Sequence, residues 1–381
     1  MKKFNFREYS RKSVVKKMGA TVLIGAMTAA CSVGCAAVKS QDEVNGENLN
    51  LDNVVYEEKK EESSNYADTI TLVWYPNESA ENFTSSRDEI GRLIEQATGK
   101  KVEQKLTTDY AIAIESVANG TAQIGCVFGA EGYIQAKNSN DAVNTLFVSS
   151  GASGTLDDAV YYSFFSVAEG NASDYLDGDS YSIQNIQGKK MSFVSNTSTS
   201  GFKVPTNSII SYFDEDSVWG NLTVDDLLEG GKDAFFGEVM FGGSHQGSAF
   251  NLMSGKAEIA AFCNTEINPY AECISGEENQ TGAVYQINEG AEAPFDTVGG
   301  KTFTVISSTP VMNGPFVYNS DTLSPEDVKA IQDLFTSDEV TNNTKIFYPA
   351  DSEEKGLTKK TADEKYVIVE DSWYDPIRNM K

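Results

Sequence analysis

The chain has 381 residues, and 40% of them are hydrophobic and 10% aromatic, which is enough for packed cores. At about 150 residues per domain, this length predicts two domains once a leader is set aside. The formal net charge of -26 argues against nucleic-acid binding, because contacts with a phosphate backbone need a basic surface.

Residues 1–35 are predicted to be an export signal of the lipoprotein type. A basic segment, MKKFNFREYSRKSVVKK, precedes the apolar run MGATVLIGAMTAA, which is too short to span a bilayer as a stop-transfer helix. Cys31 and Cys35 each follow small residues that resemble a bacterial lipoprotein cleavage site, so either could become the lipidated N-terminus. An ordinary cleaved secretion signal is the alternative. Residues 36–65 are polar and acidic, which predicts a disordered tether.

The next part of the chain alternates between strand and helix patterns. A strand is expected in TITLVWYP, and a helix follows with Ser86 as its N-cap and Gly99 after its last turn. A second strand, a helix capped by Asp109 and a third strand in AQIGCVF complete a parallel α/β pattern.

A second α/β series follows, with strands in KKMSFVS, EVMF and AEIAAFC. Strands in AVYYSFFSV and KTFTVISS link the two series, and a terminal helix capped by Ser324 returns to the first. We expect an α/β protein of two lobes joined by a hinge around a ligand cleft. Lobe 1 is expected to comprise residues 66–165 plus 306–381, and lobe 2 residues 166–305.

Two stretches of lobe 2 share one design, in which a strand ends and short polar residues precede a helix. They are VSNTSTSGF, with Ser198, Thr199 and Ser200, and MFGGSHQGSAF, with His245, the single histidine of the chain. Hydroxyls and unpaired N–H groups at helix starts can bind an oxyanion. His245 would add one donor, or two and a positive charge when protonated. The alternative is that both stretches are plain helix caps, and Pro205 suggests a helix that begins after STSG.

Catalytic and metal-binding patterns do not assemble. One histidine excludes a zinc site built on several, and the cysteines lack metal-ligand spacing. There is no G-x-S-x-G elbow and no phosphate-binding GxxxxGK[ST]. We therefore expect no enzyme activity, no metal and no cofactor. Cys263 and Cys273 are close enough in sequence for a disulfide in an oxidising compartment, and three buried thiols, Cys126 included, are the equal alternative.

Segments spread over residues 69–336 carry a resemblance to a known family. They are VWYPNESAE, TTDYAIAIESVANGTAQIG, YYSFFSV, FVSNTSTSGFKVP, GGSHQGS, GKAEIAAF and ISSTPVMNGPFV. Together, and above all through STSG followed by GSH, they make the chain similar to the substrate-binding proteins of the phosphate/phosphite/phosphonate ABC transporter family. The resemblance implies a type II periplasmic-binding-protein fold with the anion between the two lobes.

The resemblance also implies which residues bind the ligand. Its phosphoryl-binding residues match Ser198, Thr199 and Ser200, its histidine matches His245, and the tyrosine of its TDYA motif matches Tyr110. A second tyrosine would come from the linking strand, where alternation lets only one of Tyr161 and Tyr162 face the cleft, and we expect Tyr162.

The chain departs from the family's pattern at two places. Ser195-Asn196 stands where many members have Asp-Pro before STSG. After GKAEIAAF, members that bind aminoalkylphosphonates carry an acid that pairs with the amino group, and here Cys263-Asn264 takes that place. Asn264 remains a candidate contact, whereas Glu266, two residues on, is expected to be a solvated surface acid. A buried ammonium without a carboxylate is costly, which puts an aminophosphonate ligand in doubt.

The function implied is that of the extracytoplasmic, lipid-anchored component of an ABC importer. It would be a monomer that captures phosphonate, phosphite or phosphate and delivers it to a permease and its ATPase. Protonated His245 should be favoured in the complex, so binding is expected to tighten below about pH 7. The alternative is a surface sensor or binding lipoprotein for another oxyanion or an organic phosphate, with a hydrolase as a distant third.

Overall fold

A computed structural model describes residues 66–76, 83–350, 352 and 356–381. The predicted signal peptide, the predicted tether and the two lipidation candidates Cys31 and Cys35 lie outside the described residues. Within the described part of the chain, no helix has the length and apolar character needed to cross a membrane.

The first lobe is built on a mixed sheet with the strand order β17-β4-β14-β3-β1-β2. Strands β1, β2 and β3 run parallel, as the alternating pattern predicts, and β14 and β17 return antiparallel from the C-terminal part of the chain. The strands are β1 (Thr69–Trp74), β2 (Lys101–Leu106), β3 (Ile124–Cys126), β4 (Val143–Ser149), β14 (Phe316–Asn319) and β17 (Tyr366–Val367). The helices are α1 (Thr84–Thr98), α2 (Tyr110–Ala118), α3 (Ala130–Ser139), α7 (Pro325–Phe335), α8 (Asp338–Thr341) and α9 (Asp375–Arg378).

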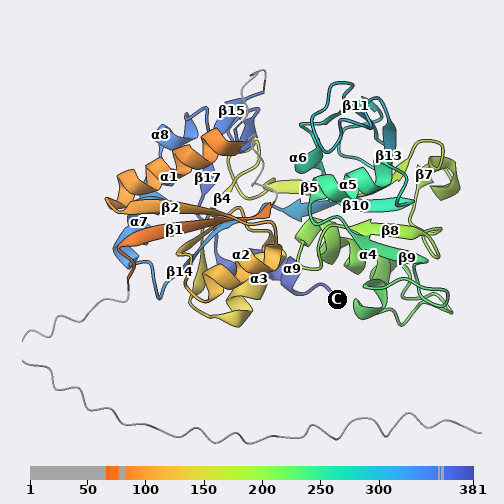
Figure 1. Cartoon of the computed structure of the whole chain (residues 1–381), viewed down its shortest axis with the longest axis horizontal. Coiled ribbons are helices and arrows are strands. Elements are labelled where there is room, and N and C mark those ends of the chain that lie inside the picture. The colour runs from red at the N-terminus through yellow and green to blue at the C-terminus, as the bar shows by residue number, and fades with distance from the viewer. Residues whose placement is uncertain (1–65, 77–82, 351, 353–355) are drawn as a thin grey trace, which may run out of the picture. The chain divides into compact units, whose positions relative to one another are not determined.

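The second lobe is built on a sheet with the order β11-β12-β13-β5-β10-β8-β9 (Figure 1). Its strands are β5 (Val160–Ala168), β8 (Lys190–Phe193), β9 (Glu238–Phe241), β10 (Ile259–Cys263), β11 (Ala271–Ser275), β12 (Val284–Ile287) and β13 (Thr302–Met312). Its helices are α4 (Val204–Tyr212), α5 (His245–Met253) and α6 (Asn264–Ile267). Two short pairs of strands, β6 (Leu176–Asp177) with β7 (Ser180–Tyr181) and β15 (Phe347–Pro349) with β16 (Thr358–Lys360), lie outside both sheets.

The lobes are joined by β5 and β13, which pair antiparallel along their whole length, from Phe303 opposite Ala168 to Met312 opposite Val160. Both strands belong to the second sheet. The lobe boundaries expected at 165/166 and 305/306 therefore fall inside these strands, and the sheet of the second lobe begins near residue 160 and ends near residue 312. The apolar runs of β5 and β13 could not show this, because a strand pattern does not say which sheet the strand joins.

The C-terminal segment makes a third connection between the lobes. The Tyr374 hydroxyl donates to the carbonyl of Asn313, at the end of the hinge strand β13 (3.1 Å). Beyond α9, the Lys203 ammonium donates to the Met380 carbonyl (3.2 Å), and Lys381 N–H donates to a side-chain oxygen of α4 (3.0 Å). Figure 1 shows α9 beside α3, on the side of the first lobe that faces α4. The C-terminus thus holds both lobes in their observed contact.

Local capping signals in the sequence are largely confirmed. The Asp109 side chain accepts from Ala111 N–H at the start of α2, and the Ser324 side chain accepts from Asp327 N–H at the start of α7. Gly99 ends α1 with a φ of 68°. The N-cap expected at Ser86 is wrong, because α1 begins at Thr84 and Ser86 Oγ instead donates to the Lys345 carbonyl (2.7 Å).

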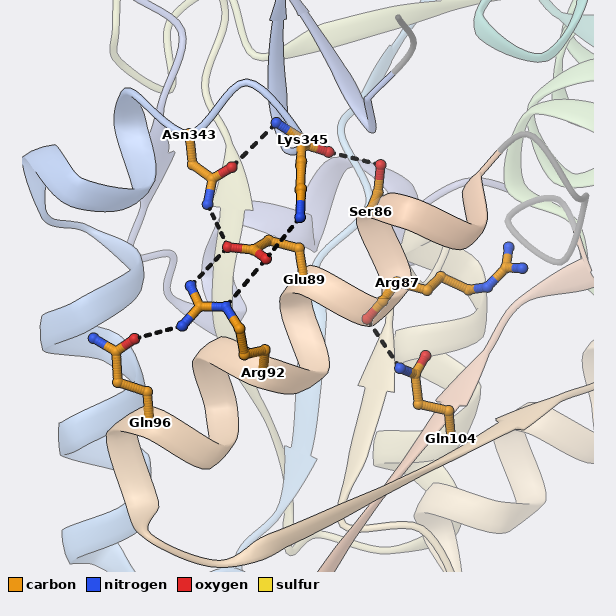
Figure 2. A network of polar contacts seen from close by, with 8 residues as sticks. All are labelled: Ser86, Arg87, Glu89, Arg92, Gln96, Gln104, Asn343 and Lys345. Carbon is orange, nitrogen blue, oxygen red and sulfur yellow. Dashed lines mark hydrogen bonds and ion pairs between the residues drawn. The ribbon is translucent and has the colours of Figure 1, made fainter.

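A polar network beside Ser86 fastens α1 to the chain that follows α8 (Figure 2). The Glu89 carboxylate accepts from Arg92 (2.7 Å) and from Asn343 (2.8 Å), and Lys345 lies 3.5 Å away. Hydrogen bonding to Arg92, opposed by burial, lowers the pKa of Glu89 to about 2. Its partners lie on α1 and on the segment after α8, which are far apart in the sequence. Glu89 therefore stabilises the contact between these two parts of the first lobe.

Candidate functional site

The STSG stretch forms the start of a helix in the second lobe. Ser198 is the N-cap, and its Oγ accepts from Gly201 N–H (3.1 Å). One π turn, Thr199–Lys203, then leads into α4, and the bond from Lys203 N–H to the Ser198 carbonyl (3.0 Å) closes its wider ring. Pro205 falls in the first turn of α4, and the carbonyls behind it that its missing N–H cannot bond accept from other elements, Gly201 from Val194 N–H and Ser200 from Ser163 Oγ. STSG is therefore part of the helix start and not a preceding loop.

The Ser200 hydroxyl is the least satisfied polar group of this helix start. Ser200 is 1% exposed, and its Oγ has no hydrogen-bond partner. Its carbonyl is held by Ser163 of β5, whose Oγ donates over 2.6 Å. A buried hydroxyl left unpaired costs about 1–3 kcal/mol, so an orphan at a helix N-terminus indicates a ligand contact.

His245 lies at the start of the other helix, α5, behind its N-cap Ser244. The ring is 2% exposed, and its Nδ1 accepts from Cys263 N–H (3.0 Å). A neutral ring that accepts at Nδ1 carries its proton on Nε2, which is therefore a donor. Burial lowers the pKa of His245 to about 3. The imidazolium considered from the sequence is thus not the form found here, and His245 offers one neutral donor.

Tyr110 and Tyr161 lie on the same side of the hinge. Tyr110, the first residue of α2, is 2% exposed, and Tyr161 packs against the apolar cluster that contains it. Burial raises the pKa of Tyr161 and that of the Cys263 thiol. Cys263 lies opposite Ser163 in the sheet, and Ser163 holds the Ser200 carbonyl, so Cys263 and Ser200 both lie beside this part of β5.

The other tyrosine of β5 lies elsewhere. Tyr162 packs against the second lobe's own apolar cluster, and its N–H donates to Asn264 Oδ1 (2.8 Å). This bond gives Asn264 a structural partner. The side chains of neighbouring strand residues point to opposite faces of the sheet. Because Tyr162 faces the core of the second lobe, the structure favours Tyr161 as the cleft tyrosine, whereas Tyr162 was expected from the sequence.

The two lobes meet at the STSG helix start. Glu131 N–H, in the first turn of α3, donates to Thr199 Oγ1 (2.9 Å). A Cβ at Gly129, the N-cap of α3, would stand 2.7 Å from the same oxygen, so glycine permits this approach. The N-termini of α3 and of the STSG helix are therefore brought together across the cleft. Both helix dipoles favour a negative charge there.

Glu266 is buried, contrary to the surface position expected from the sequence. It is 6% exposed, and its carboxylate accepts from Gln246 of α5 (3.0 Å). After burial, the charge of Glu266 is the next cause that raises the pKa of Tyr110 and that of Cys263, to about 12 for the thiol. The expected solvated acid is thus a buried carboxylate, bonded to the first turn of α5. The helix that folds it inward, α6, has only four residues, too few for any periodic pattern.

A pocket of about 300 Å³ opens beside Tyr110, between the lobes. Its second-lobe wall contains the departure Ser195-Asn196 and the aromatic ring of Phe241, which is 42% exposed. The pocket is lined by Thr108, Asp109, Tyr110, Val194, Ser195, Asn196, Phe241 and Gly243.

Of the two alternatives for the cysteines, the structure does not have the disulfide. Cys126, Cys263 and Cys273 are thiols, the first two buried and the third half-buried. Cys263 ends β10 and Cys273 lies in β11, with β5, β13 and β12 between them in the sheet. Four strand spacings of about 4.8 Å exceed the reach of a disulfide. Among the residues that the structure describes, no cluster of three or more His, Cys, Asp or Glu side chains could hold a metal ion.

Comparisons with known proteins agree with this geometry. The family model described as ABC transporter, phosphonate, periplasmic substrate-binding protein matches residues 72–374. The phosphate-import protein PhnD of Mycolicibacterium smegmatis is 26% identical over 329 residues, which cover 83% of this chain and 85% of that protein.

Solved structures show the same fold. A binding protein component of an ABC phosphonate transporter from Pseudomonas aeruginosa matches with a TM-score of 0.56 and 18% identity, over 82% of this chain and 85% of that one. PhnD1 of Prochlorococcus marinus, in complex with methylphosphonate, matches with a TM-score of 0.54 and 13% identity, over 82% of this chain and 97% of that one. The two sheets described above are thus the two lobes of a type II periplasmic-binding fold. Because the family model spans most of the chain, the protein belongs to the periplasmic substrate-binding proteins of phosphonate ABC transporters.

Proposed function

We propose that this protein captures a small phosphorus oxyanion between its lobes and hands it to the permease and ATPase of an ABC importer. The phosphoryl oxygens would be bound by Ser198, Thr199 and Ser200, by His245 Nε2, and by the hydroxyls of Tyr110 and Tyr161. The observation that carries this proposal is the buried Ser200 hydroxyl, unpartnered at a helix N-terminus that faces a second helix N-terminus.

These donors are neutral, and their strength comes from their number and their burial. Fixed hydroxyl, N–H and imidazole donors replace the hydration of the anion, and the two helix dipoles add a favourable field. The chain's formal net charge of -26 does not attract an anion. At physiological salt, screening acts over about 8 Å, so donors inside the cleft outweigh distant surface acids.

The buried carboxylate of Glu266 indicates which kind of phosphorus ligand the site prefers. A carboxylate only accepts hydrogen bonds, so beside an anion it favours a ligand whose other end is a cation or a donor. The charge of Glu266 contributes to the raised pKa of Tyr110, and Tyr110 also lines the pocket of about 300 Å³, which is where an organic substituent would lie. We therefore favour an aminoalkylphosphonate over inorganic phosphate, which reverses the doubt raised by Cys263-Asn264.

The role would be one of binding without catalysis, by a monomer held at the outer face of the cytoplasmic membrane. The anchor would be a lipid on Cys31 or Cys35, both of which lie outside the described residues. The mass of the N-terminal peptide of the mature protein, isolated from membranes, should show a lipidated cysteine. An unmodified peptide recovered from the medium would contradict the anchor and leave the binding role intact.

Isothermal titration calorimetry with 2-aminoethylphosphonate, methylphosphonate, phosphite, phosphate and sulfate tests the binding role. We expect at least one phosphorus ligand to bind, and Ser200→Ala to weaken it by about 10-fold or more through the loss of one buried hydrogen bond to a charged group. The matched control is Ser248→Ala, whose hydroxyl is buried in the same lobe but already bonded to the Ala261 carbonyl (2.9 Å). Ser248→Ala should lower stability and leave affinity unchanged. Equal affinities for wild type and Ser200→Ala would refute the assigned site.

A further inference from the structure

A second buried hydroxyl without a partner lies in the first lobe. Tyr75 is 1% exposed, and its Oη makes no hydrogen bond. Among the described residues, only Tyr75, Ser166 and Ser200 have such a side-chain atom. Phenylalanine would make the same ring contacts without the cost of about 1–3 kcal/mol for an unpaired buried hydroxyl. The hydroxyl therefore calls for an explanation outside the packing of the lobe.

The position of Tyr75 directs it to the cleft. It directly follows β1, at the carboxyl end of a parallel strand, where α/β sheets bind their ligands. Its ring meets that of Tyr110 edge-on, with centroids 4.8 Å apart, and that of Phe128 at 4.4 Å. Figure 1 shows α2 and α3 side by side in the first lobe. The Tyr75 ring is thus held rigidly beside a residue already assigned to the site.

The hydroxyl itself reaches the first turn of α3. A Cβ on Gly132 would stand 1.5 Å from Tyr75 Oη, so only glycine leaves room for it. One residue earlier in the same turn, Glu131 N–H donates to Thr199 Oγ1 (2.9 Å). Tyr161 of β5 packs against the apolar cluster that contains Tyr75. Ser163, two residues on and therefore on the same face of β5, holds the Ser200 carbonyl. Tyr75 and Ser200 therefore approach the same face of β5, one from each lobe.

We propose that the Tyr75 hydroxyl is a further ligand-binding donor, which binds a phosphoryl oxygen from the first lobe opposite Ser200 of the second. This proposal rests on the proposed function. A ligand that pairs with a hydroxyl from each lobe stabilises the arrangement in which both are buried, so Tyr75 couples binding to the contact between the lobes. The hydroxyl is unpaired without ligand, so its hydrogen bond adds to the affinity for the ligand and not to the stability of the unliganded protein.

Tyr75→Phe separates this role from packing. The variant should unfold at the same urea concentration as wild type or a higher one, because an unpaired buried hydroxyl is removed. Its affinity for 2-aminoethylphosphonate and for methylphosphonate should fall by about 10-fold, and by the same factor for both, because they share the phosphoryl group. The matched control is Tyr285→Phe, whose hydroxyl accepts from Asn279 N–H (2.9 Å) in the second lobe. That variant should be less stable and bind as wild type does.

The outcomes distinguish this inference from the proposed function. Wild-type affinity in Tyr75→Phe, together with weak binding by Ser200→Ala, would overturn the role of Tyr75 and keep the site. A lower urea midpoint of Tyr75→Phe without ligand would also overturn it, because the hydroxyl would then have a structural partner. A larger loss for one phosphonate than for the other would place Tyr75 at the organic end and overturn the phosphoryl contact. If no phosphorus ligand binds wild type, both proposals fail.

Discussion

Glu266→Gln is expected to weaken the binding of 2-aminoethylphosphonate by about 100-fold or more, and to leave methylphosphonate binding unchanged or slightly tighter. Removal of one partner from a buried ion pair costs about 3–5 kcal/mol, because the ammonium is left buried without a counter-charge. Methylphosphonate has no ammonium, and loss of a negative charge beside its phosphoryl group cannot weaken it. Calorimetry with the two ligands measures the change in preference.

The control for Glu266→Gln removes the same charge from the same lobe outside the cleft. Glu258 is partly exposed and lies 3.6 Å from Lys189, so Glu258→Gln should bind both ligands as wild type does. Equal losses for the two ligands in Glu266→Gln would mean that the carboxylate supports the site structurally, through Gln246 or its other neighbours. No change for either ligand would refute the cation contact.

The wild-type protein is expected to lose stability more steeply than His245→Gln as the pH falls below about 6.5. In the unfolded chain, histidine takes up a proton near pH 6.5, whereas folded His245 does so only near pH 3. Between these values unfolding binds a proton, so the free energy of unfolding falls by about 1.4 kcal/mol per pH unit from this group alone. The stability that neutral His245 contributes is fully present above pH 6.5.

Urea unfolding of both proteins at pH 7.5, 6, 5 and 4.5 measures this difference, since all other titrating groups are shared. The stability of wild type relative to His245→Gln should decline steadily below pH 6.5. Parallel curves would show that His245 is not held neutral.

Because buried His245 stays neutral, the tightening of binding expected below pH 7 should not occur. The ratio of wild-type to variant affinity for methylphosphonate should stay constant between pH 7.5 and pH 5.5, because Cys263 N–H occupies Nδ1 and leaves Nε2–H as the donor at both values.

The residues of the proposed anion site are recognisable in the sequence because local chemistry defines them. Ser198, Thr199 and Ser200 follow a strand and open a helix, and the structure has them there. The same holds for His245 at the start of α5 and for the caps Asp109 and Ser324. Capping and strand patterns act over a few residues, so they can be predicted without knowledge of the fold.

What the sequence could not decide depends on contacts between distant segments. The protonation of His245 depends on its burial and on the N–H of Cys263. The choice between Tyr161 and Tyr162 depends on which face of β5 packs against the first lobe. The sequence predicts a surface acid at Glu266 because its one-turn helix has no periodic pattern. It gives no sign of Tyr75, whose hydroxyl is buried only because Gly132 of α3 lies against it. Sequence alone therefore determined the family, the fold class and the hydroxyl and imidazole groups at two helix starts. The tertiary structure decided their protonation, their partners and the orientation of each tyrosine, because burial and pairing are set by residues far apart along the chain.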